Sequence, residues 1–102
     1  MSKANAIPAE DRAAARGLME LPNVGPAVAR DLLVLGVRTP ADLRSRDPDE
    51  MYAALNRADG KRHDPCCRDV FAALIDHANG APARPWWHYT TERLRSEGAH
   101  TR

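Results

Sequence analysis

Adjacent cysteines and two nearby histidines have the residue types that could bind a metal ion: Cys66, Cys67, His63 and His77. Zinc ligands must converge at about 2.0–2.3 Å from one centre. Ten or eleven residues of one expected helix separate the cysteines from His77, which is about 15 Å at the rise of an α-helix. The spacing therefore argues against zinc, and we expect no metal site and no cofactor.

The two thiols leave two interpretations open. Cys66 falls in the first turn of the expected helix, where the positive end of the helix dipole favours the thiolate form. Cys67 falls on the face that the same helix would bury, where a free cysteine packs as a small hydrophobe. A packing role is the commoner one for such residues. Cys66 is nevertheless a candidate reactive thiol, and we expect it to react faster than Cys67.

A short turn between two expected helices has the residue types of a phosphate site, in the stretch LPNVGPAVAR at residues 21–30. Asn23 and Gly25 accept positive φ at low cost, and the apolar Val24 between them is expected to point into the core. Gly25 and Pro26 suit the N-cap and the first position of the next helix. Exposed N–H groups at a helix N-terminus form an anion site.

This turn resembles the helix-hairpin-helix motif, whose hairpin usually reads Gly-apolar-Gly and whose amides meet a nucleic-acid phosphate. Two positions depart from that pattern: Asn23 replaces the first glycine, and Ala27 stands where a Lys, Arg or Thr often holds phosphate. The candidate DNA contacts are the backbone N–H groups around Asn23, Val24, Gly25 and Ala27, with Arg30 nearby. Arg44 and Arg46, in a second turn without glycine, are further candidates, although solvated surface arginines are the favoured interpretation there.

Composition limits the function classes. The 102 residues suffice for one domain, 28% of them are charged and 43% are apolar, and the net charge is only +1. A dedicated nucleic-acid binder usually has a clear basic excess, so any DNA binding should be weak.

No signal segment or long apolar run is visible, and adjacent cysteines do not cross-link distant parts of a fold, so we expect a cytoplasmic protein with reduced thiols. No nucleophile–base set or Walker-type loop is present, so we expect no enzyme.

A cap residue followed by proline recurs along the chain and predicts where helices begin, at Gly25, Thr39, Asp47 and Asp64. Asp47 with Glu50 has the spacing of a capping box. The expected helices cover residues 8–19, 26–35, 39–43, 48–58 and 65–79, and no segment alternates with period two. We therefore predict an all-α fold in a single domain of residues 8–95, with a flexible arm at 1–7 and a flexible tail at 96–102.

The segment after Gly80 holds two prolines and a group of aromatic residues: Pro82, Pro85, Trp86, Trp87 and Tyr89. The prolines predict an extended strap, followed by a short helix at 90–95. The favoured interpretation is that Trp86 or Trp87 folds back to seal a core poor in aromatic residues. The alternative is that the pair forms an exposed platform for a protein partner or a nucleic-acid base.

In this order, the motifs resemble the small bacterial pathogenicity-locus family, many of whose members are called mitomycin-resistance proteins. The matching stretches are residues 21–25, 35–37, 42–43, 47–48, 63–66, 70–71 and 86–87. The resemblance implies a paired helix-hairpin-helix (SAM-like) core of about five helices with a C-terminal Trp-containing extension.

The same resemblance implies a non-catalytic, sequence-independent duplex-DNA-binding module with an accessory role in DNA repair or mitomycin resistance, since mitomycin cross-links DNA. The alternative is a protein–protein adaptor, which the low net charge, Asn23 and the Trp pair favour. The sequence does not give the oligomeric state, and no contact with a membrane is expected.

Overall fold

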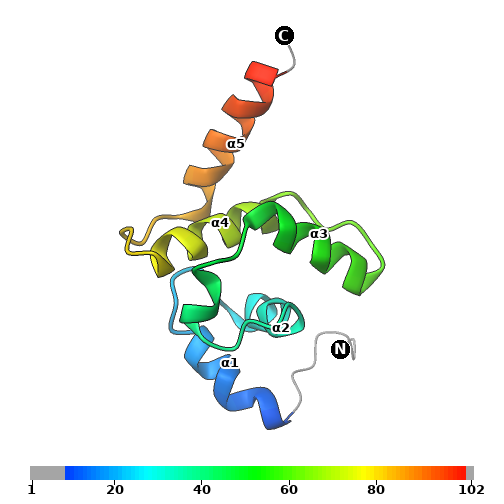
Figure 1. The fold of residues 1–102 in the computed structure, drawn as a ribbon, viewed down its shortest axis with the longest axis vertical. Helices are drawn as coiled ribbons and strands as arrows, with labels where there is room; N and C mark the ends of the chain where they lie inside the picture. Colours follow the sequence, from blue (N-terminus) through cyan, green and yellow to red (C-terminus); the bar gives the residue numbers. More distant parts are fainter. Residues whose placement is uncertain (1–8, 101–102) are drawn as a thin grey trace.

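The structure is a computed structural model that describes residues 9–100, with side chains described for residues 9–95. Within residues 9–100 the chain is helical and has no strand, as expected for the all-α class (Figure 1). A 3₁₀ turn, η2 (Ala9–Asp11), leads into α1, and a second, η3, lies between α2 and α3. The α-helices are α1 (Arg12–Leu18), α2 (Pro26–Val34), α3 (Pro48–Asp59), α4 (Cys66–Ala78) and α5 (Trp86–His100), and η3 covers Pro40–Leu43. The predicted arm at 1–7 lies outside the described residues.

Caps and glycines set the helix boundaries much as the sequence predicts. Asp47 accepts a hydrogen bond from the Glu50 amide at 3.0 Å, which caps α3. The reciprocal half of the predicted capping box is absent, because the Glu50 carboxylate pairs with Arg46 instead. Gly36 (φ 82°) and Gly60 (φ 65°) end α2 and α3 in the left-handed region, where glycine avoids steric strain.

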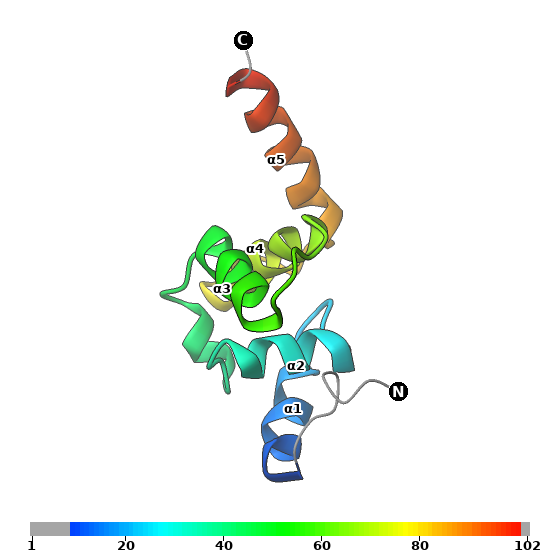
Figure 2. The ribbon, with the colours of Figure 1, turned by 90° about the vertical axis from the view of Figure 1, so that its right-hand side faces the viewer.

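Helix α4 packs against α3 and η3, while α2 packs against α1 and α3, and these elements together form the core (Figures 1 and 2). Its buried members are Ala15, Leu18, Val24, Ala29, Leu32, Val37, Leu43, Met51, Leu55, Phe71, Leu74 and Ile75. A second, smaller cluster of Ala72, Ala73 and Tyr89 joins α4 to α5.

Helix α4 is buried on more than the one face that the sequence predicts. Phe71 and Leu74 are buried as expected, but Cys67 is only half-buried and lies outside the core cluster. Ala73, off the predicted face, is buried as well. The reason is that α3 packs against one side of α4 and α5 packs against another, so the middle of α4 is enclosed.

The predicted strap is shorter and the last helix longer than the sequence suggests. Residues 81–85 have no regular secondary structure, and Trp86 and Trp87 begin α5, which continues to His100. Helix α5 thus includes residues 96–100, where we expected a loose tail, and projects away from the other helices (Figures 1 and 2). Pro85 directly precedes the helix, a position at which proline is well tolerated. No helix among the described residues is both long and apolar enough to cross a membrane.

Candidate nucleic-acid interface

The α1–α2 turn (residues 19–25) has the conformation that its sequence predicts, with one exception. Asn23 is exposed at φ 68°, and Val24 points inward with 9% of its surface exposed. Gly25, in contrast, has φ −99° and ψ −173°, which is extended backbone. Only Asn23 therefore uses the left-handed region, and Gly25 takes the extended backbone of the predicted N-cap instead of the positive φ that glycine permits. An added Cβ at Gly25 would meet no atom within 4 Å.

The N-terminus of α2 presents amides that are available to a ligand. Among residues 9–95, the N–H groups of Gly25, Ala27 and Val28 have no hydrogen-bond partner. The ladder of α2 begins only with Ala29, whose amide donates to the Gly25 carbonyl at 2.9 Å. Ala27 is exposed and small, so its side chain leaves these amides accessible. The free amides and the positive end of the α2 dipole are suited to one anion.

The side chain of Asn23 joins this turn to the segment that precedes α5. Its Nδ2 donates to the Arg84 carbonyl at 3.1 Å across 61 residues. We call residues 81–85, which contain this carbonyl, the connector. An asparagine in place of the usual glycine thus keeps the left-handed turn and anchors it to the connector, which places the turn next to the start of α5.

Arg30, a predicted DNA contact, is held by carboxylates instead. Its guanidinium donates to both oxygens of Asp59 at 2.9 and 3.0 Å and to Asp31 at 3.0 Å, and its side chain is only 13% exposed. The hydrogen bonds from Arg30, with a smaller contribution from His63, lower the pKa of Asp59 to about 2. His63 approaches the same carboxylate, with Nε2 at 2.7 Å from Oδ2. The guanidinium of Arg30 therefore belongs to an intramolecular cluster.

The arginines of the second turn also make bonds within the protein. Arg46 pairs with both oxygens of Glu50 at 2.8 and 2.9 Å and donates to the Leu35 carbonyl at 2.8 Å. Arg44 is exposed, and its Nε donates to the Ala78 carbonyl at 3.1 Å. Arg46 is half-buried rather than a freely solvated residue, and it holds this turn against the end of α2. Of the two, Arg44 is the more accessible to a ligand.

Both thiols are half-buried, and neither has the lowered pKa expected for a helix N-terminus. The carboxylate of Asp64, which also accepts a hydrogen bond from the Cys66 amide at 2.8 Å, raises the pKa of Cys66. Burial raises the pKa of Cys67. At Cys66 the hydrogen bond with Asp64 therefore shifts the pKa in the direction opposite to the one expected from the helix N-terminus. That Cys66 reacts faster than Cys67 stays a prediction.

The two histidines considered as metal ligands have separate partners. Nδ1 of His77 lies 3.0 Å from the Ala81 carbonyl, whereas His63 pairs with Asp59. Among the described residues no group of three His, Cys, Asp or Glu side chains is arranged to hold a metal ion.

The aromatic residues of α5 do not pack in the way that the sequence favours. Tyr89, 6% exposed, closes the core beside α4 and donates its hydroxyl to Asp76 at 2.8 Å. Trp86 is half-buried and meets Trp87 edge-to-face, with ring centroids 5.8 Å apart. Trp87 is 59% exposed. Tyr89 therefore takes the sealing role expected of a tryptophan, and the indole of Trp87 faces solvent.

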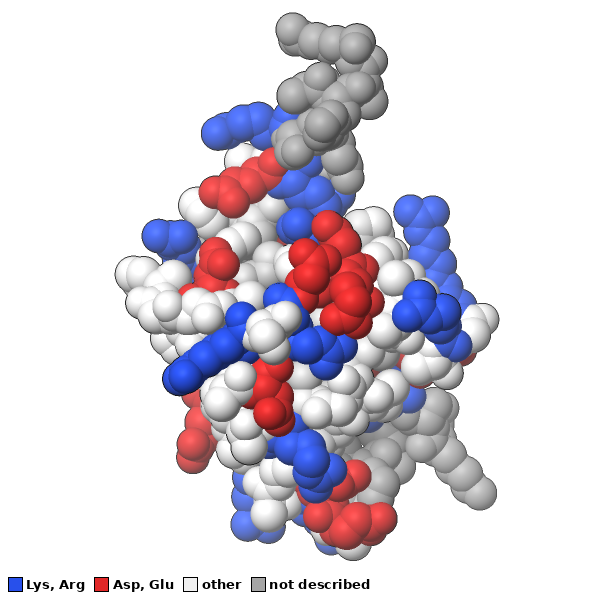
Figure 3. Space-filling model, viewed as in Figure 1, with Lys and Arg blue, Asp and Glu red and all other residues white. Residues whose placement is uncertain are grey.

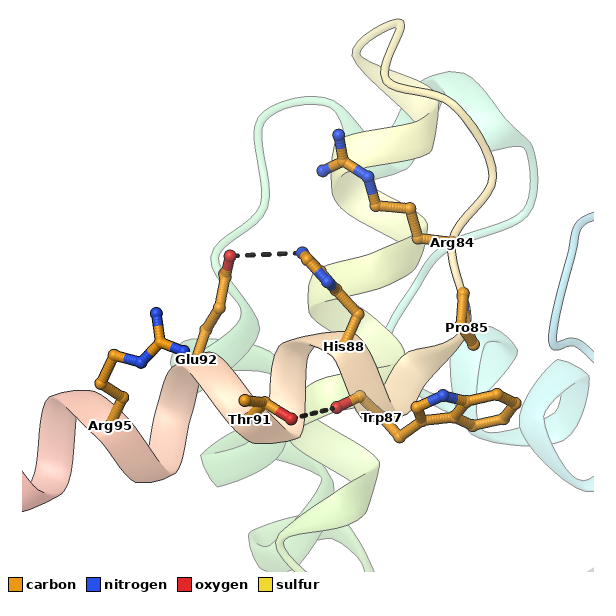
Figure 4. A pocket seen from close by; sticks show the side chains of 7 residues that line it. All are labelled: Arg84, Pro85, Trp87, His88, Thr91, Glu92 and Arg95. Carbon is orange, nitrogen blue, oxygen red and sulfur yellow. Dashed lines mark hydrogen bonds and ion pairs between the residues drawn. The ribbon is translucent and has the colours of Figure 1, made fainter.

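A shallow groove of about 550 Å³ lies along the start of α5 (Figure 4). In the figure, the Trp87 indole lies alongside Pro85, while His88 and Glu92 face each other in an ion pair with Nε2 and Oε1 3.2 Å apart. We call this the α5 groove; its lining residues are Arg84, Pro85, Trp87, His88, Thr91, Glu92 and Arg95. Sequence reasoning missed it because it treated residues 86–89 as extended. Helical spacing from Trp87 to Thr91 and Arg95 would have placed these residues on one side.

Charges of both signs are interspersed over the face in Figure 3, and neither sign covers it. This distribution agrees with the net charge of +1. It offers no broad basic surface on that face, so a phosphate site has to depend on local groups such as the free amides of α2.

Comparison with known proteins places the chain in a family. Residues 11–95 match the family described as Pathogenicity locus. The chain belongs to this family. It is also 50% identical over 78 residues to the "Mitomycin resistance protein McrB" of Streptomyces lavendulae, a match that covers 76% of this chain and 74% of that protein. No solved structure matches the chain.

The Pathogenicity locus match confirms the resemblance inferred from the sequence. It begins at Asp11, ends at Arg95, and so includes the α1–α2 turn, the connector and the whole α5 groove. Both candidate surfaces are therefore part of the domain that the family shares.

Proposed function

We propose that this protein is a non-catalytic module that binds duplex DNA weakly and without sequence preference, and that α1, the α1–α2 turn and α2 act as a helix-hairpin-helix unit. The observation that carries the proposal is the set of free amides of Gly25, Ala27 and Val28 at an exposed helix N-terminus. Backbone amides recognise a phosphate without reading bases, so the binding would be independent of sequence.

The second predicted hairpin, η3 with α3, has a different role in this proposal. Asp47 already caps the α3 N-terminus, and Asp49 and Glu50 put two more carboxylates in its first turn. A phosphate would be repelled there. We infer that η3 and α3 complete a paired helix-hairpin-helix core and support the first hairpin, which alone meets DNA.

The charges favour low affinity. The guanidiniums of Arg30 and Arg46 are engaged with carboxylates, and the net charge is +1. Few cations are then left to neutralise phosphates, so we expect a dissociation constant in the range of ordinary non-specific binding, about 10⁻⁴–10⁻⁶ M at moderate salt.

The similarity to a protein named for mitomycin resistance supports a cellular role for such binding. Mitomycin cross-links DNA, and a module that holds the DNA backbone is suited to an accessory role in protection or repair. We propose that role for this chain. A protein-interaction adaptor is the second candidate, and the observation that favours it is the 59% exposed indole of Trp87.

The test is a fluorescence titration of labelled duplex DNA with the wild type and with Gly25→Val. The backbone at Gly25 accepts any residue and the added Cβ has open space, so the variant should fold. Its side chain would cover the neighbouring amides, and we expect at least a tenfold loss of affinity, because a hydrogen-bonded ionic contact contributes roughly 1.5–3 kcal/mol.

The matched control is Gly17→Val, which makes the same change at an exposed position of α1 that also has open space. It should leave binding unchanged, and circular dichroism checks the fold of both variants. A folded Gly25→Val protein that binds like the wild type would contradict the hairpin proposal. A folded wild type that binds no DNA at low salt would overturn DNA binding and favour the adaptor.

A further inference from the structure

The exposed indole of Trp87 follows three residues after Arg84, whose carbonyl is bonded to the α1–α2 turn, and the α5 groove around it has the chemistry of a nucleotide site. Trp87 is 59% exposed, and its ring makes an edge-to-face contact with the half-buried Trp86. A large aromatic ring that is exposed to solvent and packed against a second ring is a stacking surface for a planar group.

The groove also has cations for a phosphate backbone. Arg84 and Arg95 are both exposed and line the groove with Trp87, against the single carboxylate of Glu92. Oε1 of Glu92 lies 3.2 Å from Nε2 of His88. Trp87 and Arg95 are eight residues apart on one helix, about 12 Å at the α-helical rise, so an extended strand along α5 would meet the ring and a guanidinium in succession (Figure 4).

The hydrogen bond from Asn23 to the Arg84 carbonyl, 3.1 Å long, fixes the α1–α2 turn against the connector that forms one end of this groove. A DNA backbone that meets the free amides of α2 would therefore be able to continue into the α5 groove. Bases within a duplex are already stacked on their neighbours. An unpaired base, in contrast, has a free face for the indole.

We propose that the α5 groove binds a single-stranded segment of DNA, with an unpaired base stacked on Trp87 and its backbone near Arg84 and Arg95. The preferred ligand is then a junction between duplex and single strand. This inference rests on the proposed function, since the duplex side of the junction is held by the α1–α2 turn.

The experiment compares a blunt duplex with the same duplex carrying a single-stranded thymine overhang, by fluorescence anisotropy at low salt. The wild type should bind the overhang DNA about tenfold more tightly, because base–aromatic stacking contributes roughly 1–3 kcal/mol per base. Trp87→Ala should remove this preference and leave the blunt duplex unaffected. Trp87→Phe, which keeps an aromatic face, should retain most of it.

Leu94→Ala is the matched control, because Leu94 is another large apolar residue on α5 with similar exposure, 55%, but does not line the groove. It should bind both DNAs like the wild type. Indole fluorescence provides a second readout: the overhang DNA should quench the wild type, and Trp87→Phe, which keeps Trp86, should lose that quenching.

The outcomes separate this inference from the proposed function. Equal wild-type affinity for the two DNAs, with Gly25→Val still weakening both, would overturn the Trp87 inference alone. Overhang binding that depends on Trp87 but survives Gly25→Val would instead overturn the hairpin proposal. If Trp87→Ala matches the wild type on both DNAs, stacking is refuted and the exposed indole is better explained by a protein partner.

Discussion

Arg30 illustrates how much a single residue's role depends on partners that are distant in sequence. On α2 alone it lies off the apolar face and next to the proposed phosphate site, which is why the sequence predicts a DNA contact. In the folded chain Asp59, 29 residues later, accepts two hydrogen bonds from its guanidinium. No local pattern predicts such a pair. The positive φ of Asn23 and the burial of Val24, which depend on neighbouring residues, were predicted correctly.

The Arg30–Asp59 pair should make stability depend on pH in the acid range. The pKa of Asp59 is lowered to about 2 from its ordinary value of 3.8, so the unfolded chain binds the proton more tightly. The stability from this pair is therefore complete above about pH 4 and is lost as pH falls towards 2. We expect Asp59→Asn to lower the free energy of unfolding by about 2 kcal/mol at neutral pH.

Urea denaturation at several pH values measures this effect. The free energies of unfolding of the wild type and Asp59→Asn should converge as pH falls from about 4 to 2, because protonation of Asp59 then removes the charge that the variant lacks. Asp49→Asn is the control, because Asp49 also pairs with an arginine but is 75% exposed and should contribute little. If the free energies of unfolding of Asp59→Asn and the wild type differ by the same amount across this pH range, the Arg30–Asp59 pair does not cause the pH dependence.

At the scale of elements, α5 is attached to α4 mainly through a buried carboxylate. Asp69 has no exposed surface, and its Oδ2 accepts a hydrogen bond from the Thr90 hydroxyl at 2.6 Å. Its Oδ1 accepts from Arg93 Nε at 3.0 Å, and Arg68 lies 3.6 Å away. Apart from the cluster around Tyr89, α5 has little buried apolar surface among its described side chains. This network therefore sets where α5 lies on α4.

Thr90→Val tests the network without changing the shape of the side chain. It removes a hydrogen bond to a buried charge, and we expect the free energy of unfolding to fall by about 2 kcal/mol. Thr91→Val is the matched control, because the Thr91 hydroxyl is exposed and donates only to the Trp87 carbonyl within α5. It should change stability by less than about 0.5 kcal/mol. Urea unfolding of the two variants makes the comparison, and equal stabilities would refute the network's role.

The elements that begin at a cap and proline were predictable, and α5 was not. Gly25-Pro26, Thr39-Pro40 and Asp47-Pro48 each precede the helix that the sequence predicts, because capping and the fixed φ of proline act locally. The start of α5 depends instead on contacts with Asp69 and Asp76, which lie ten or more residues before it. The prolines beside Trp86 favoured an extended strap, and tertiary contacts outweighed that local signal.

At the scale of the whole molecule, the small net charge limits how DNA could be held. The molecule is elongated, about 49 × 32 × 22 Å, and both signs of charge alternate over the face in Figure 3. That face has no long basic track along which a duplex could lie, and the net charge is only +1. Any complex should therefore neutralise few phosphates, and amide hydrogen bonds should contribute much of its affinity.

The dependence of duplex binding on salt measures the number of phosphates neutralised. We expect log K to fall with log salt concentration with a slope of about −1 to −2, corresponding to one or two phosphates. Titrations of blunt duplex across several salt concentrations give this slope, and Arg30→Gln should leave it unchanged because Arg30 is paired internally. A slope steeper than about −5 would point to an extended basic surface and contradict contact through one turn.

The bond between Asn23 and the Arg84 carbonyl has a consequence for the order in which the protein is made. The ribosome adds residues at roughly 5–20 per second, so the 61 residues between these partners take roughly 3–12 s to synthesise. The α1–α2 turn therefore leaves the ribosome well before the backbone that anchors it. A nascent chain, or a product truncated before Arg84, has the amides of the proposed phosphate site without their tether. The site is complete only when the synthesis of α5 is about to begin.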